Sequence, residues 1–480
     1  MATDMIAQAM AMDARAAADG KADLVGGKVP ASELPSATEE SAGIMSAEDK
    51  LKLDGIQTDP SVVIIEDALN VNSENAVENG VITRKFVDVD ANIAALRLLM
   101  NATLYGYRVN KNDSNPETRV EYLYDAVGMT PARMNFTTGQ FDYGSWSNAW
   151  FITGNKPVAL KFDGTVDYEL DPDDYSKKAD GTASDVTDST YAGNFMASMP
   201  TVWIKRWEDD NYEYTAISSK QITPDFYADA HDNGSEINDM IYLPMFKGCI
   251  VDGKMRSLSG VTPTVSKTGS QEKTAAEACG SGWQLWDWSK HELISDLLTL
   301  ISRSTDSQAA FGNGYVNGSA VKTVGTSGAG RFWGANDQTH LVKAFHIEDL
   351  WGHRWDRCLG INLVNNQYVY KLVAPYLLEP DSSYTYSGLY APVSDKYQKY
   401  QNIGRYGRLP KVTGDGASAT TYVCDYFWKN ASGVRRGLCG GYYSTGMDCG
   451  SRYLGLGGAA STTHVNVGGS PCFNPPHEGV

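Results

Sequence analysis

The sequence predicts an α+β body, rich in short strands, joined to an elongated N-terminal segment. Aromatic residues are nearly absent before about residue 105 and dense after it. The chain is 42% hydrophobic and 11% aromatic and contains 47 glycines, so it has the material for a sizeable core and for many turns. We therefore expect a connector over residues 1–104 and a globular body over residues 105–480.

Charge and cysteine content exclude several classes of protein. The formal net charge is −17, which repels phosphate backbones and makes nucleic acid an unsuitable partner. No stretch is apolar enough for a membrane span, and the N-terminus lacks the apolar core of a secretory signal. The seven cysteines are an odd number without C-x-x-C pairs, which favours free structural thiols from a reducing compartment. We expect no cofactor and no bound metal.

The connector divides into two parts. Residues 1–75 are expected to be extended, because most of this stretch mixes Gly, Pro, Ser and acidic residues with little periodicity. Residues 76–104 contain apolar positions spaced alternately by four and three, which is the seam of a short coiled coil: Ile82, Phe86, Val89, Ile93, Leu96 and Met100. The alternative is an amphipathic helix docked on the body.

The body shows period-two and period-3.6 patterns. One helix is predicted over Ser289–Ser302, where Leu293, Leu297 and Ile301 belong to a single apolar face. Strands are predicted from β-branched and aromatic runs bounded by turn residues, at Val158–Phe162, Thr201–Arg206, Tyr212–Ile217, Tyr368–Val373 and Thr421–Trp428. The acidic run Asp163–Asp188 lacks the order of a calcium loop, which favours solvated loops.

The segment Phe345–Gly360, FHIEDLWGHRWDRCLG, has two interpretations. Its ionisable residues would suit a metal or acid/base cluster: His346, Glu348, Asp349, His353 and Asp356. Alternatively, Trp351 and Trp355 pack in a core while the charged residues pair nearby. The histidine spacing matches no recognised zinc pattern, so packing is favoured. The segment resembles the core signature of the formylglycine-generating-enzyme branch of C-type-lectin-like folds at Leu350, Trp351, Gly352, Trp355 and Asp356.

The C-terminal run Arg436–Phe473 combines a glycine frame with polar and aromatic residues. Small residues hold a tight backbone, while Tyr, Ser and Asn side chains are typical of binding loops. We expect the outward-pointing residues to be Tyr442, Ser444, Thr445, Asp448, Thr462, His464 and Asn466. The alternative is a glycine-rich surface hairpin with no partner.

Three segments resemble phage proteins. Residues 36–56, SATEESAGIMSAEDKLKLDGI, resemble an element widespread in phage fibre chains, and residues 73–86 resemble one that leads into their oligomerising helices. Residues 421–473 resemble the variable region of diversity-generating-retroelement proteins, the family of phage tropism determinants. Two departures are Tyr443, where Trp is usual, and the ending Gly469-Ser470-Pro471, where Arg is frequent.

These resemblances imply a C-type-lectin-like body on a stalk, with a variable region over about 440–468. They imply a tail-fibre receptor-binding protein, not an enzyme, that recognises a bacterial surface protein or glycan. The implied ligand-binding residues are Tyr442, Tyr443, Ser444, Thr445, Asp448, Gly455, Gly457, Gly458, Thr462, His464, Val465 and Asn466. A homotrimer on the virion is expected, made in the host cytoplasm and attached to other tail or baseplate proteins through its N-terminus.

Two alternatives remain open. A formylglycine-generating-type enzyme would need a close pair of cysteines, whereas Cys439 and Cys449 are ten positions apart. A purely structural tail-fibre segment would need no binding face. Neither a G-x-S-x-G elbow nor a dinucleotide fingerprint is present, since GTSGAG at Gly325–Gly330 lacks the flanking strand and helix.

Overall fold

The computed structural model describes Leu51, residues 101–323 and residues 330–477. The body predicted from residue 105 begins with the strand β1, Leu104–Asn110. It is mostly β-sheet with few helices, which confirms the α+β class. The extended connector and the coiled coil predicted before residue 101 lie outside the described residues.

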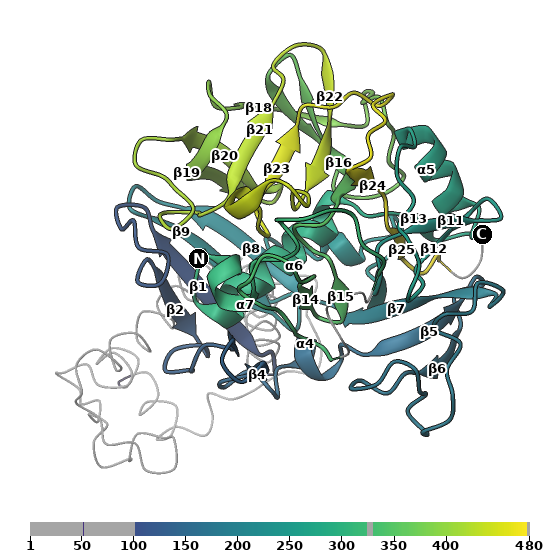
Figure 1. Cartoon of the computed structure of the whole chain (residues 1–480). Coiled ribbons are helices and arrows are strands. Elements are labelled where there is room, and N and C mark those ends of the chain that lie inside the picture. The colour runs from purple at the N-terminus through teal and green to yellow at the C-terminus, as the bar shows by residue number, and fades with distance from the viewer. Residues whose placement is uncertain (1–50, 52–100, 324–329, 478–480) are drawn as a thin grey trace, which may run out of the picture. The chain divides into compact units, whose positions relative to one another are not determined.

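Two sheets are built largely from the first part of the body (Figure 1). One has four strands in the order β2 (Val120–Tyr124), β1, β9 (Tyr212–Ser218) and β8 (Trp203–Glu208). The other has six strands in the order β13 (Trp283–Leu285), β25 (Pro471–Phe473), β10 (Met240–Pro244), β7 (Gly193–Pro200), β5 (Pro157–Lys161) and β6 (Val166–Glu169). The last strand of the chain thus pairs with two strands from its middle.

The third sheet has nine strands and contains the predicted variable region. Its order is β18 (Thr385–Tyr390), β17 (Gln367–Tyr370), β16 (Trp355–Val364), β22 (Val434–Cys439), β23 (Leu454–Leu456), β21 (Tyr426–Lys429), β19 (Lys396–Gly404) and β20 (Gly407–Thr413). The ninth strand, β24 (Val467–Gly468), pairs in parallel with β16. Loops that leave β22 and β23 therefore return to the same sheet.

Short elements complete the described body. Three two-stranded ribbons pair β3 (Arg133–Asn135) with β4 (Gln140–Asp142), β11 (Cys249–Val251) with β12 (Lys254–Arg256), and β14 (Lys343–Ala344) with β15 (Ile347–Glu348). The helices are α4 (Trp150–Thr153), α5 (Gly269–Glu277), α6 (Trp288–Ser302) and α7 (Ser307–Phe311), with 3-10 turns η2 (Asp229–His231) and η3 (Gly446–Asp448).

Most of the strand predictions are confirmed, with one informative exception. The strands β5, β8, β9 and β17 overlap the predicted ranges, although β17 ends earlier, at Tyr370. The run Thr421–Trp428 forms a strand only from Tyr426, because Tyr422 and Cys424 adopt positive φ angles of 62° and 68°. Left-handed residues cannot continue a strand. The bend aims the buried Asp425 carboxylate at the backbone N–H of Arg452, 2.5 Å away.

The helix α6 differs from its predicted environment. Its boundaries agree with the pattern, since the Asp287 side chain caps it by accepting from the Lys290 N–H and Arg303 ends it at a φ of 51°. The pattern places the apolar residues on one face of the helix, and in the structure all fifteen residues, the polar ones included, are buried. Figure 1 shows α6 in the middle of the body, with the nine-stranded sheet above it. Its polar side chains must therefore find partners inside the protein.

Those partners form an ionic cluster around Asp296. The Asp296 carboxylate lies 2.6 Å from Arg206 Nε and accepts a 2.9 Å hydrogen bond from the Tyr107 hydroxyl. Arg452 Nη2 also donates to it, and Arg408 Nε is 3.6 Å away. Burial would raise the pKa of Asp296, but the three guanidinium groups outweigh it and hold the pKa well below its usual range. The cluster joins β1, β8, β20 and the segment before β23.

Replacement of Asp296 by Asn should destabilise the body strongly. The substitution keeps the shape of the side chain but leaves buried guanidinium groups without their carboxylate, a change that costs about 3–5 kcal/mol. Urea unfolding would measure the difference in the free energy of unfolding. The matched control is Glu121→Gln, which breaks a partly exposed 2.6 Å pair with Arg108 and should cost less than about 1 kcal/mol.

The wild type and Asp296→Asn should differ in how their stability changes with pH. Because the folded pKa of Asp296 is depressed, its contribution to stability is present above its unfolded pKa of about 3.9 and is lost as pH falls toward the folded value. The difference in the free energy of unfolding between wild type and Asp296→Asn should therefore become smaller below about pH 4. A difference that stays constant with pH would contradict the ionic role of Asp296.

Candidate functional site

Two loops of the predicted variable region converge on one pair of residues. The first loop runs over 440–453 from β22 to β23, and the second over 457–466 from β23 to β24. The Arg354 guanidinium lies over the Tyr443 ring at 5.4 Å and donates to the Val465 carbonyl. The backbone N–H of Trp355 donates to the Asn466 carbonyl at 2.9 Å. Residues more than twenty positions apart are thus brought together by Arg354 and Trp355.

A row of aromatic rings extends from the first loop across the sheet. Tyr443 contacts Tyr442 at 5.5 Å between ring centroids, and Tyr442 lies 6.5 Å from Trp355. Trp355 packs edge-on against Tyr453 at 4.5 Å, and Tyr453 lies 6.0 Å from Tyr426. Trp355, Tyr426 and Tyr453 were not predicted from the sequence as neighbours of this site. The period-two alternation in Tyr426–Trp428 indicates a strand, but it does not indicate which residues pack against that strand.

Two of the predicted glycines lie against tryptophan rings and not on the surface. A Cβ atom at Gly455 would come within 3.1 Å of the Trp355 ring, and one at Gly457 within 2.2 Å of the Trp428 ring. Both glycines are buried, while Trp428 keeps 41% of its surface exposed. Glycine at 457 therefore leaves room for the Trp428 indole, and any side chain there would displace the ring.

Two threonines of the predicted set brace their own loops. The Thr445 hydroxyl donates to the Tyr442 carbonyl at 2.6 Å and accepts from the Tyr442 N–H at 3.2 Å. The Thr462 hydroxyl accepts from the Ala459 N–H at 2.9 Å. Both side chains are half-buried. These hydrogen bonds reduce the freedom of the loops before any ligand is bound.

Asp448 is anchored to a strand outside the variable region. Its carboxylate accepts a 2.6 Å hydrogen bond from the Tyr397 hydroxyl on β19. Burial and the Asp448 charge raise the pKa of Tyr397 well above its usual range. The Tyr397 ring also packs edge-on against Tyr426 at 5.4 Å. Asp448 thus fixes the far end of the first loop to the aromatic row.

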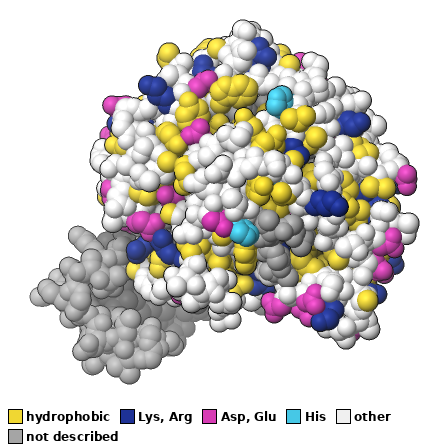
Figure 2. All heavy atoms as spheres, in the orientation of Figure 1, with side chains coloured by type: hydrophobic (Ala, Val, Ile, Leu, Met, Phe, Trp, Pro, Cys, Tyr) yellow, Lys and Arg dark blue, Asp and Glu magenta, His cyan; other side chains and the backbone are white. Residues whose placement is uncertain are grey.

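The remaining predicted residues divide by exposure. Ser444, His464 and Val465 are exposed, with 53% of Val465 accessible, and Tyr442, Tyr443 and Gly458 are half-buried. Asn466 differs from the expectation that it points outward, because only 7% of it is exposed. It lies directly before β24, where the chain turns back into the sheet. On the face drawn in Figure 2, hydrophobic side chains gather in the region where Figure 1 labels β21, β22 and β23.

The packing interpretation of Phe345–Gly360 is confirmed. Trp351 is fully buried and Trp355 is 4% exposed, both in the main core. Lys247 Nζ pairs with Asp356 at 2.5 Å. His353 Nδ1 hydrogen-bonds to Asp349 at 3.0 Å, while its Nε2 accepts from the Val321 N–H at 2.9 Å. Both ring nitrogens of this histidine are thus occupied by the protein.

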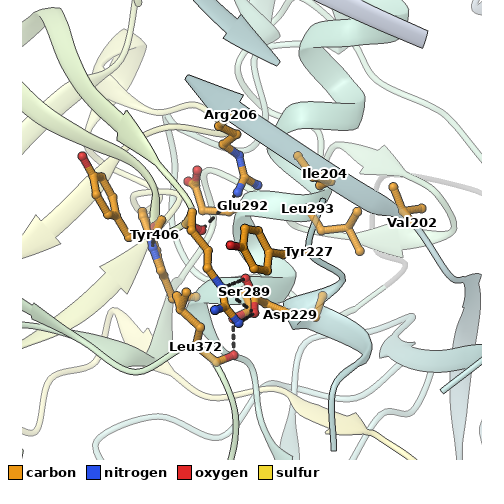
Figure 3. Close-up of a pocket in the computed structure, with 13 residues that line it drawn as sticks. Val202, Ile204, Arg206, Tyr227, Asp229, Ser289, Glu292, Leu293, Leu372 and Tyr406 are labelled. Atoms are coloured by element: carbon orange, nitrogen blue, oxygen red, sulfur yellow. Dashed lines mark hydrogen bonds and ion pairs between the residues drawn. The ribbon is translucent and has the colours of Figure 1, made fainter. Parts of the chain in front are cut away.

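A small cavity lies beside the first half of α6 (Figure 3). Arg206, Glu292 and Tyr406 line it, and Arg405 holds Asp229 at 2.5 Å on one side. The Glu292 Oε1 atom has no hydrogen-bond partner among the described residues. The volume of about 20 Å³ holds one water molecule, which would satisfy that oxygen. The cavity therefore suits a structural water and not a substrate.

The cysteines are free and buried, which confirms the expectation from their number and spacing. Burial raises the pKa of Cys249 and of Cys279 to about 11. Cys439 differs. Burial opposes ionisation of its thiol, but a hydrogen bond with Cys358 and the nearby His291 outweigh it and lower the pKa to about 6. A polarised thiol pair is therefore present, although each cysteine is only 2% exposed.

The seven thiols should react slowly with a disulfide reagent in the native protein. Burial limits access to all of them, including Cys439, whose depressed pKa would otherwise make it the most reactive. Titration with Ellman's reagent at pH 8 should detect less than about one thiol per chain within minutes, and seven after unfolding in guanidinium. Rapid native reaction that disappears in Cys439→Ser would instead reveal an accessible reactive thiol.

No model of a known protein family matches the chain, and no curated protein matches its sequence. Among the described residues, no helix is both long and apolar enough to cross a membrane.

Proposed function

We propose that this protein is a phage tail-fibre adhesin that recognises a bacterial surface protein or glycan through the loops 440–453 and 457–466. The observation that carries the proposal is the convergence of these two loops on Arg354 and Trp355. A binding face needs side chains from separate segments held at fixed relative positions. The face defined here consists of Tyr442, Tyr443, Ser444, Asp448, Gly458, His464 and Val465, and we call it the loop face.

The composition of the loop face suits recognition by contact. Tyrosine supplies a large contact area at a low cost in conformational entropy, and Ser and His adapt their hydrogen bonds to a partner. The hydroxyls of Thr445 and Thr462 already restrain the two loops, so less freedom is lost when a ligand binds. The exposed Trp428 adds an aromatic surface on the neighbouring strand.

A C-type-lectin-like fold is part of the proposal. Its support is the resemblance of Phe345–Gly360 and of residues 421–473 to that class, together with their structural relation. The first segment ends in β16, and the second contributes β22 and β24, which pair with β16 on its two edges. A buried turn beside the sheet and loops that leave the sheet and return to it are what the resemblance implies.

The proposal also includes the assembly. The resemblances at residues 36–56 and 73–86 support attachment to other tail or baseplate proteins and a homotrimer formed through residues 76–104. Three copies of the loop face on one virion would raise the apparent affinity by about 10²–10⁴ through avidity. Diversification of the variable region by a retroelement would change the exposed residues while Gly455 and Gly457 maintain the packing.

A formylglycine-generating-type enzyme is the second candidate, because Cys439 shares a buried site with Cys358 and His291. The pair differs from the one considered from the sequence, which joined Cys439 to Cys449. The thiols are on the inward face of the sheet, opposite the loop face, and are nearly inaccessible. Oxidation of a cysteine-containing peptide by the purified protein, lost in Cys439→Ser, would favour this candidate.

Replacement of Tyr443, His464 and Val465 by Ala should weaken adsorption to host cells. His464 and Val465 are exposed, Tyr443 is half-buried, and the three side chains come from both loops. We expect a loss of at least about tenfold in apparent affinity, because exposed anchors at the centre of a face carry most of its binding energy. Flow cytometry of labelled full-length protein on a panel of intact bacteria would measure saturable binding.

The matched control replaces Tyr386, Tyr390 and Val393 by Ala. These residues are 51%, 60% and 100% exposed and belong to β18 or follow it, at one end of the sheet order, whereas β22 and β23 are in its middle. The control should bind like the wild type, and both variants should keep the wild-type melting temperature. Loss of binding in the control alone would move recognition to the β18 edge, and full binding by both would overturn the loop face as the adhesive surface.

A further inference from the structure

Alternate backbone carbonyls of the second loop are held by donors from outside the loop. Three of its carbonyl oxygens accept hydrogen bonds from the body of the protein. The pairs are the Gly269 N–H with Ala460 at 3.0 Å, the Arg357 Nη2 with Thr462 at 3.5 Å and the Ser266 N–H with His464 at 3.1 Å. The peptide groups of this loop therefore have a fixed orientation, with these carbonyls directed toward the body.

The N–H groups of the same peptide units point the opposite way. The peptide bonds of the loop are trans, and in a planar trans unit the C=O and N–H bonds are antiparallel. The N–H groups that share units with the held carbonyls are those of Ser461, Thr463 and Val465, and all three residues are exposed. None of these N–H groups has an acceptor among the described residues. The second loop thus presents three backbone donors to solvent, at alternate residues.

The second loop carries no acidic side chain that could compete for these donors. Residues 457–466 read GGAASTTHVN, without Asp or Glu. The carboxylate of Asp448, in the first loop, already accepts from the Tyr397 hydroxyl at 2.6 Å. The net charge of −17 belongs to the whole chain, and physiological salt screens exposed charges beyond about 8 Å. The groups close to the second loop therefore decide which ligand chemistry it accepts.

We propose that the ligand of the loop face is an acidic glycan, whose carboxylate or phosphate oxygens accept from the N–H groups of Ser461, Thr463 and Val465. This inference rests on the proposed adhesin function and names its ligand class. Anionic oxygens match backbone donors well, because hydrogen bonds to a charged acceptor are about twice as strong as neutral ones. Donors at alternate residues suit acceptors that repeat along a polymer, and the Tyr443 ring offers an apolar surface to the C–H face of a sugar.

A carboxylate placed among these donors should repel the ligand. In Thr463→Glu the full-length protein should lose at least about tenfold in apparent affinity for intact host cells, because like charges that meet across an interface are strongly unfavourable. The matched control is Thr463→Gln, which has the same length without the charge and should keep most of the wild-type affinity. Both variants should keep the wild-type melting temperature, since Thr463 is exposed. Equal affinity of Thr463→Glu and Thr463→Gln would contradict the proposal.

Chemical treatment of the host cells distinguishes the possible sources of the acid. Carbodiimide with glycinamide converts surface carboxylates to amides, whereas cold hydrofluoric acid removes polymers linked by phosphodiesters. Binding of the wild type, followed by flow cytometry, should be lost after one of these treatments and retained after protease digestion of the cell surface. Binding that survives both treatments, or that is lost after protease digestion, would overturn the acidic glycan. Failure of the wild type to bind any untreated strain would instead count against the adhesin function itself.

Discussion

The buried carboxylate of Asp296 organises the body, because four segments around α6 present a cation or a hydroxyl to it. Arg206 comes from β8, Tyr107 from β1 and Arg408 from β20, while Arg452 precedes β23. A lone buried charge would be too costly to keep ionised, so these groups have to be present together. The helix can be central only because its polar side is neutralised from four directions.

The loop face depends on this interior through Arg452. Its guanidinium is held by Glu292 and Asp296 on α6, while its backbone N–H donates to Asp425 before β21. The first loop therefore ends on an arginine whose position is determined by the core. Four residues earlier, the hydrogen bond between Asp448 and Tyr397 fixes the same end of the loop to β19. Variation at Tyr442 to Ser444 can thus change the surface without loosening the scaffold.

The loop face and the Cys358–Cys439 pair occupy opposite sides of the nine-stranded sheet. In β16, Trp355 and Arg357 point to the side of the aromatic row, whereas Asp356 and Cys358 point inward, and Asp356 pairs with Cys439 in register. Alternation along a strand assigns these residues to separate environments. The accessible side presents tyrosine, histidine and glycine, and the inaccessible side presents polarised thiols. This separation favours recognition over thiol chemistry as the role of the outer surface.

The sequence by itself determined the α+β class, the boundaries of α6, several strands and the packing role of Trp351, because these depend on local periodicity and on the size of buried side chains. It also located the glycine-rich frame at 440–468, because the positions of glycines can be read directly from the sequence. Only the tertiary structure decided that α6 is buried on all sides, that Gly455 and Gly457 lie under tryptophan rings, and that Asn466 turns inward. Each of these depends on a partner distant in the chain, such as Arg206 for Asp296 or Trp428 for Gly457. Local pattern cannot specify which distant side chain will fill the space beside a residue.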